Sequence, residues 1–120
     1  MKYTNTKRKN GILEITDEEI QRLLDAGINP YSLISTRFPD ALENWKVRIW
    51  EWEDQHLGRE VKLSLDVPSS LVIKGSTYPI KDQLKALGFR WQGFEKYWAK
   101  RVASIEEAIE LAQKIQEVGK

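Results

Sequence analysis

The fold follows from residues 61–102, which read VKLSLDVPSSLVIKGSTYPIKDQLKALGFRWQGFEKYWAKRV. Apolar and polar residues alternate from Val61 to Val67, and Pro68 then interrupts the pattern because proline cannot donate a ladder hydrogen bond. This alternation predicts a β-strand with one buried face. The apolar run at residues 71–73 predicts a second strand.

The remainder of this stretch predicts one helix and a hairpin. A helix is expected from 79 to 88, because a proline opens the segment, its apolar residues share one face and a glycine closes it. Two runs rich in aromatic and β-branched residues, 89–91 and 97–102, flank the turn Gln92-Gly93-Phe94-Glu95. Such runs around a glycine-containing turn are typical of an antiparallel hairpin.

Two capping boxes mark the starts of further helices. Thr16 is followed three residues later by Glu19, and Ser104 by Glu107, so that each pair can satisfy free backbone N–H groups. Gly27 is expected to end the first of these helices. The second carries a continuous apolar stripe and closes the chain.

The segments between these landmarks are less uniform. Residues 1–10 are polar and basic and predict a mobile arm, and residues 29–37 predict a short helix with Asn29 as its cap. Residues 39–58 fit two patterns: a helix with apolar residues three and four apart, or an alternating strand with one bulge. Sequence alone leaves both interpretations open.

The expected fold class is α+β. A helical region precedes a small, mostly antiparallel sheet that packs against two helices in the order β-β-α-β-β-α. The expected organisation is a basic arm at 1–10, a helical, acidic and Trp-rich region at 11–58, and an α+β module at 59–120.

Composition excludes several classes of function. The chain has no cysteine and one histidine, so thiol nucleophiles, disulfides and cysteine-based metal sites are impossible. His56 has only flexible acidic neighbours, which make a weak ligand set, and no nucleophile–base pair or phosphate loop occurs. We therefore expect no enzymatic activity, no metal and no cofactor. No apolar run is long enough for a signal peptide or membrane span, so a cytoplasmic location without membrane contact is expected.

The net charge of +1 conceals two regions of opposite sign. Residues 10–60 carry five basic and eleven acidic side chains, whereas residues 74–101 carry seven basic and two acidic ones. A polyanionic partner responds to this local sign more than to the net charge.

The basic region contains a motif of the form TYPxKxxLKxLG, then RW, a turn, and KxW. Over residues 74–102 it resembles a small Trp-containing module of bacterial and phage DNA-processing proteins, and it is loosely similar to the HARP domain of annealing helicases. The resemblance implies contact with branched or partly single-stranded DNA. The turn departs from the family pattern, which usually has acidic or proline-containing sequence there. The matching residues are Tyr78, Pro79, Lys81, Leu84, Lys85, Leu87, Gly88, Arg90, Trp91, Lys96 and Trp98.

Aromatic side chains beside basic ones suit single-stranded nucleic acid, because bases stack on rings while lysine and arginine neutralise phosphates. The expected function is non-catalytic binding of single-stranded or branched DNA. The candidate phosphate contacts are Lys74, Lys81, Lys85, Arg90, Lys96, Lys100 and Arg101. The candidate stacking residues are Tyr78, Trp91 and Trp98, with Tyr97 as a further platform. Whether Trp91 and Trp98 stack on a ligand or pack in the core stays open.

The acidic segment at residues 40–54 supports an alternative function. Its acidic side chains are interleaved with Trp45, Trp50 and Trp52. Such a surface could dock a protein through Trp50 and Trp52, as an adaptor or inhibitor of the phage or mobile-element type.

Overall fold

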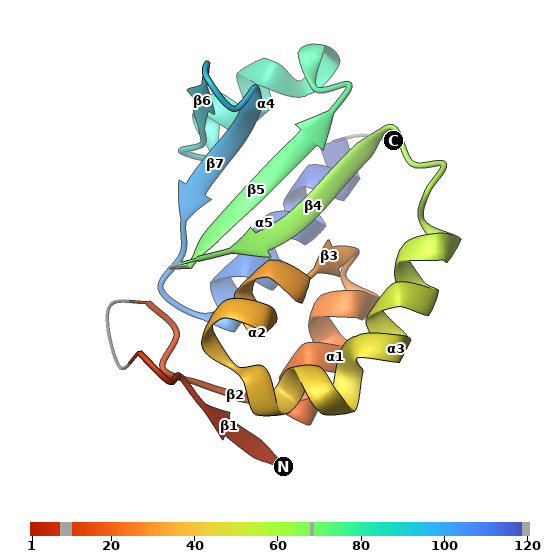
Figure 1. Ribbon diagram of the computed structural model, residues 1–120. Helices are drawn as coiled ribbons and strands as arrows, with labels where there is room; N and C mark the ends of the chain where they lie inside the picture. The colour runs from red at the N-terminus through yellow and green to blue at the C-terminus, as the bar shows by residue number, and fades with distance from the viewer. Residues whose placement is uncertain (8–10, 68, 119–120) are drawn as a thin grey trace.

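The computed structural model describes residues 1–7, 11–67 and 69–118 (Figure 1). The strands form a two-stranded and a five-stranded sheet. Strand β1 (Lys2–Thr4) pairs with β2 (Glu14–Thr16), and the larger sheet has the order β3-β4-β5-β7-β6. Its strands are β3 (Ile28–Asn29), β4 (Val61–Asp66), β5 (Ser70–Gly75), β6 (Arg90–Gln92) and β7 (Tyr97–Arg101). The helices are α1 (Asp17–Asp25), α2 (Tyr31–Arg37), α3 (Pro39–Gln55), the 3₁₀ turn η1 (Tyr78–Ile80), α4 (Lys81–Ala86) and α5 (Ile105–Val118).

The predicted α+β class and the order β-β-α-β-β-α from residue 61 onward are confirmed. The pairs β4–β5, β5–β7 and β6–β7 are all antiparallel. The capping box of Thr16 and Glu19 is present at the start of α1. The capping box of Ser104 and Glu107 is present in part: the Glu107 backbone N–H donates to Ser104 Oγ over 3.2 Å, while the Glu107 carboxylate accepts from the Ala103 N–H.

Strand β3 was not predicted. Ile28 lies opposite Leu63 and Asn29 opposite Ser64, so these two residues add a parallel edge strand to the sheet. The helix predicted over 29–37 therefore begins at Tyr31, although the Asn29 side chain still accepts the Tyr31 backbone N–H at 2.9 Å. Two residues are too few to show a strand periodicity in sequence.

The segment from Pro39 to Gln55 is a helix, so the strand interpretation of this segment is wrong. Its stripe of Ala41, Trp45 and Ile49 is buried, and Leu42 and Trp52 also pack against the core. A regular strand would turn Leu42 and Trp52 to the face opposite Trp45 and Ile49, whereas a helix places residues three and four apart on one side. The Trp45 indole donates to the Asp17 carboxylate over 2.7 Å. Helix α3 is thereby tied to the start of α1.

The first residues are not a mobile arm where the structure describes them. Lys2–Thr4 form β1, with Tyr3 opposite Ile15 and only 5% exposed. The Tyr3 hydroxyl donates to the Asp17 carboxylate over 2.8 Å, and burial of this apolar ring offsets the ordering of the terminus. Residues 8–10 of the predicted arm lie outside the described residues.

The core lies on one face of the five-stranded sheet. Leu63, Leu65, Leu71 and Ile73 project to this face and are at most 5% exposed. Figure 1 shows α5 crossing behind the sheet on this side, with α1, α2 and α3 gathered beyond β3. Buried residues from both the N-terminal helices and the sheet belong to a common hydrophobic cluster.

Asp17 should make folding stability sensitive to acid. Hydrogen bonds from Trp45 and Tyr3, together with the nearby terminal ammonium, hold the pKa of Asp17 below its ordinary value. A carboxylate with a lowered folded pKa stabilises the protein above its unfolded pKa, and this stabilisation is lost as pH falls through the folded value. We expect Asp17→Asn to lower Tm at pH 7 and to flatten the fall of Tm between about pH 5 and 2.

Thermal melts followed by circular dichroism at several pH values measure this effect. Glu18→Gln removes an exposed carboxylate one residue away in the same first helical turn and is the matched control. A Tm–pH profile of Asp17→Asn that coincides with that of the unmodified protein would contradict the assignment.

Candidate nucleic-acid interface

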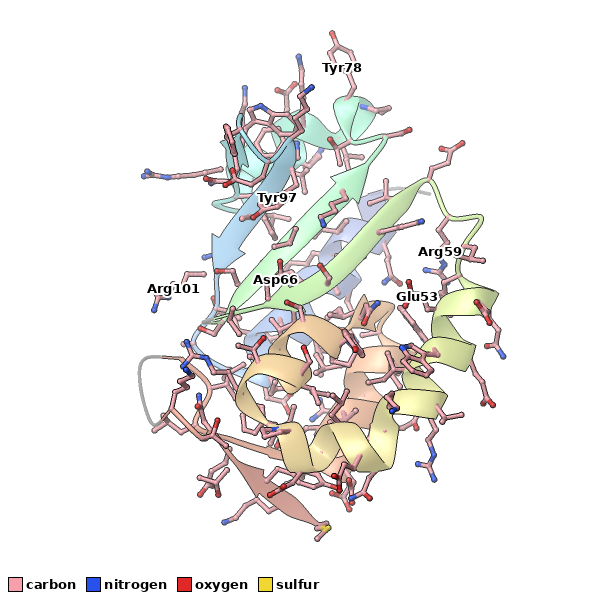
Figure 2. The ribbon with its side chains drawn as sticks, in the orientation of Figure 1. Glu53, Arg59, Asp66, Tyr78, Tyr97 and Arg101 are labelled. Carbon is pink, nitrogen blue, oxygen red and sulfur yellow. The ribbon has the colours of Figure 1, made fainter. Side chains whose placement is uncertain are left out.

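The second face of the sheet is open. Figure 1 shows β5 and β7 with no helix of the described chain in front of them. Figure 2 shows Asp66 and Tyr97 on this face, whereas Tyr78 projects at the end of the molecule near α4. An uncovered antiparallel sheet leaves its outward side chains free to contact a ligand.

Strand register determines which side chains share this open face, because paired residues project to the same side. The central row contains the small residues Ser64, Val72 and Ala99, paired in that order across β4, β5 and β7. Arg90 ends this row on the edge strand β6, opposite Ala99. Longer side chains occupy the rows on either side. These flanking rows are Lys62 with Lys74, Gln92 with Tyr97, and Asp66 with Ser70 and Arg101.

Small residues in the middle and long residues around them make a hollow of about 510 Å³, here named the sheet trough. Val72, 1% exposed, belongs to its floor. A hollow of this size can hold a planar ring system of the size of a nucleobase. The trough is lined by Asp66, Val67, Ser70, Val72, Gly88, Arg90, Gln92, Tyr97, Ala99, Lys100 and Arg101.

The trough combines cations with one aromatic ring. Arg90 and Arg101 are exposed, and Lys74 Nζ lies 5.4 Å from the centre of the Tyr97 ring. Burial, followed by the negative charges of Glu95 and Asp66, raises the pKa of Tyr97. The phenol is therefore neutral at physiological pH and can both donate and accept a hydrogen bond.

A second surface lies across the edge strand β6 and is here named the aromatic corner. Trp91 lies opposite Trp98, and their rings meet edge to face with centres 5.5 Å apart. Lys81 Nζ lies 4.2 Å from the centre of the Tyr78 ring. These residues border a cavity of about 430 Å³ together with Gly75, Ser76 and Thr77.

The two tryptophans of the corner have different roles. Trp98 lies on β7, which has neighbours on both sides; it is 6% exposed, and its indole N–H donates to Thr77 Oγ1 over 3.1 Å. Trp91 lies on the edge strand and is 50% exposed. Trp98 is thus a core residue, whereas Trp91 and Tyr78, which is 77% exposed, present open ring faces.

The ten candidate site residues do not form one continuous lane. Three of them, Lys74, Arg90 and Arg101, lie on the open face with Tyr97. Lys100 borders the trough but lies opposite Leu71 of the covered face, and its Nζ is 3.8 Å from the Glu107 carboxylate of α5. Tyr78, Lys81, Trp91 and Trp98 form the corner, while Lys85 on α4 and Lys96 in the β6–β7 turn are exposed.

Sequence reasoning missed the acidic and small members of the trough. The sequence predicts Asp66, Val72 and Ala99 as strand residues with no binding role and places Ser70 outside the second strand, which begins at Leu71 in that prediction. The alternation Tyr97, Ala99, Arg101 gives a signal, because residues two apart on a strand share a face. Which of the two faces stays uncovered cannot be read from that alternation.

The acidic Trp-rich segment exposes one indole. Trp45 is buried, and Trp52 donates to the Leu24 carbonyl over 2.9 Å while stacking on His56 at 4.1 Å. Trp50 is 47% exposed. Within the described part of the chain, no group of acidic and histidine side chains is arranged to hold a metal ion. None of the described helices combines the length and apolar character that crossing a membrane requires.

Comparisons of the chain with protein-family models, curated proteins and solved structures found no match. The geometry of the two surfaces, together with the motif at residues 74–102, is therefore the basis for the functional argument.

Proposed function

We propose that this chain binds single-stranded DNA without catalysing a reaction, and that the sheet trough receives the strand. The observation that carries the proposal is the uncovered sheet face, on which Arg90 and Arg101 flank a floor of small residues beside Tyr97. Arginine neutralises phosphates, and the part of the half-buried Tyr97 ring that faces solvent offers a base a surface to stack on.

This arrangement favours unpaired over paired bases. A base that stacks on a protein ring contributes about 1–3 kcal/mol, and it must first be free of its partner strand. Duplex DNA offers its phosphates to Arg90 and Arg101 but keeps its bases stacked inside the helix. Single-stranded DNA can supply both contacts.

The aromatic corner extends the proposal to branched DNA. Arg90 and Trp91 are neighbours on the edge strand β6 and project to opposite faces of the sheet. A strand that crosses this edge from the trough meets the open rings of Trp91 and Tyr78. The resemblance of residues 74–102 to a module of DNA-processing proteins supports the same partner class.

A binding titration tests the proposal. We expect single-stranded and forked oligonucleotides to bind more tightly than duplex of the same length, as measured by fluorescence anisotropy at two salt concentrations. With about three phosphates neutralised, log K should fall against log salt with a slope of roughly −2. Absence of binding at low salt would refute the proposal, and binding that ignores salt would refute the phosphate contacts.

The alternative, protein docking through residues 40–54, depends on Trp50 and its neighbour Val47, which are 47% and 59% exposed. Trp45 and Trp52 are engaged within the chain and offer no free indole. Trp50 of α3 is exposed to nearly the same degree as Trp91. Its substitution therefore also provides a matched control for the aromatic corner.

A further inference from the structure

Asp66 is the acidic side chain that lines the sheet trough. It ends β4 and shares a row with Ser70 of β5 and Arg101 of β7. Within the described chain its carboxylate has neither an ion-pair partner nor a hydrogen-bond donor. Its charge nevertheless acts in the trough, since it contributes to raising the pKa of Tyr97.

An acidic side chain in a surface that neutralises phosphates weakens binding of the DNA backbone, because it repels the phosphate charges. It improves binding only if the ligand presents N–H groups to it, because an ionised carboxylate accepts hydrogen bonds and donates none. Among the bases, guanine presents two adjacent donors, N1–H and the N2 amino group, on one edge. Two carboxylate oxygens can accept both of them at once.

The row of Asp66, Ser70 and Arg101 also contains a hydrogen-bond donor, the Arg101 guanidinium, far enough from Asp66 for a base to lie between them. Asp66 and Arg101 lie on strands separated by β5, so their backbones are roughly 9–10 Å apart. Their side chains can therefore approach a planar base from two sides, with Asp66 at N1–H and N2–H and Arg101 at the O6 acceptor. Thymine would turn at least one carbonyl oxygen toward the carboxylate.

We propose that Asp66 reads the base, so that the sheet trough prefers an unpaired guanine to thymine. This inference depends on the proposed binding of single-stranded DNA. It adds a specificity-determining residue to a surface whose other members contact phosphates and ring faces without regard to sequence.

The probes are two labelled octamers, one of eight thymidines and one with a single central deoxyguanosine. With the 120-residue chain we expect the guanine-containing octamer to bind at least about fivefold more tightly, the low end for a bidentate base contact. Asp66→Asn should bring this ratio close to one and should tighten binding of the thymidine octamer, because a negative charge is removed.

Glu95→Gln is the matched control. Glu95 also raises the pKa of Tyr97 but lies in the β6–β7 turn outside the trough, so its removal changes charge without changing base contacts. It should leave the guanine-to-thymine ratio unchanged. If Asp66→Asn lowers Tm so far that the variant is not folded during the titration, Asp66→Ser provides a second variant that also lacks the carboxylate.

The outcomes separate the two proposals. The role of Asp66 is overturned if the unmodified protein binds the two octamers with equal affinity, or if Asp66→Asn tightens binding of both octamers equally. Either result leaves DNA binding in place. Binding of neither octamer overturns the proposed function itself.

Discussion

Reversing the charges of Arg90 and Arg101 together should weaken binding of single-stranded DNA by at least about 100-fold at low salt. Each substitution to glutamate removes a phosphate contact and adds a repulsive charge in its place. Arg90 and Arg101 flank the same trough from β6 and β7, so both act on one bound strand. Anisotropy titrations at about 50 and 200 mM salt should also show a shallower slope of log K against log salt, reduced by the contribution of about two phosphate contacts.

The control makes the same change in net charge elsewhere. Lys46→Glu with Lys114→Glu reverses two exposed charges, on α3 and α5, away from the trough. We expect this variant to lose only the small part of the affinity that follows from net charge. Equal losses in both double variants would mean that the trough has no special role in binding.

Replacing Trp98 by alanine should destabilise the fold by about 3–5 kcal/mol, as for other large aromatic core residues. Trp98 is 6% exposed, its indole N–H is bonded to Thr77, and it lies opposite Ile73 in the middle of the sheet. Truncation would leave a cavity between the sheet and its helices and would leave the Thr77 hydroxyl without its donor. Urea unfolding followed by circular dichroism measures the loss.

Trp91→Ala is the comparison that separates packing from binding. Trp91 is half exposed and touches Trp98 edge to face, so its removal should cost only about 0.5–1.5 kcal/mol of stability. Its effect should instead be a weaker affinity for forked DNA, which Trp50→Ala should not reproduce. A Trp98→Ala protein as stable as the original would show that the core assignment is wrong.

Much of the fold could be predicted because it depends on local patterns. The alternation around Leu63 and Leu65, the capping pairs at Thr16 and Ser104, and the glycine-containing turn at Gly93 each define an element from a few neighbouring residues. The candidate site was predicted less well. Its basic and aromatic members follow from the local charge and the motif at residues 74–102, but their division between two faces depends on pairing across strands.

The elements that sequence missed all depend on distant partners. Ile28 and Asn29 form a strand only because β4 offers a free edge, and Tyr3 is ordered only because Asp17 and α3 receive it. The choice between helix and strand for residues 39–55 was decided by the buried stripe on α3, since both periodicities are present in the sequence.

The amino-acid sequence by itself determined the class of fold, the order of elements from residue 61 and the concentration of positive charge between residues 74 and 101. The tertiary structure decided which of those charges act together. Helix α5 packs on the face that carries Leu71 and Trp98, which leaves Arg90, Tyr97 and Arg101 on the other face around a floor of small residues. The physical reason is that side-chain alternation specifies two faces of a strand, while burial of apolar surface by a distant helix selects the face that solvent, or a ligand, can reach.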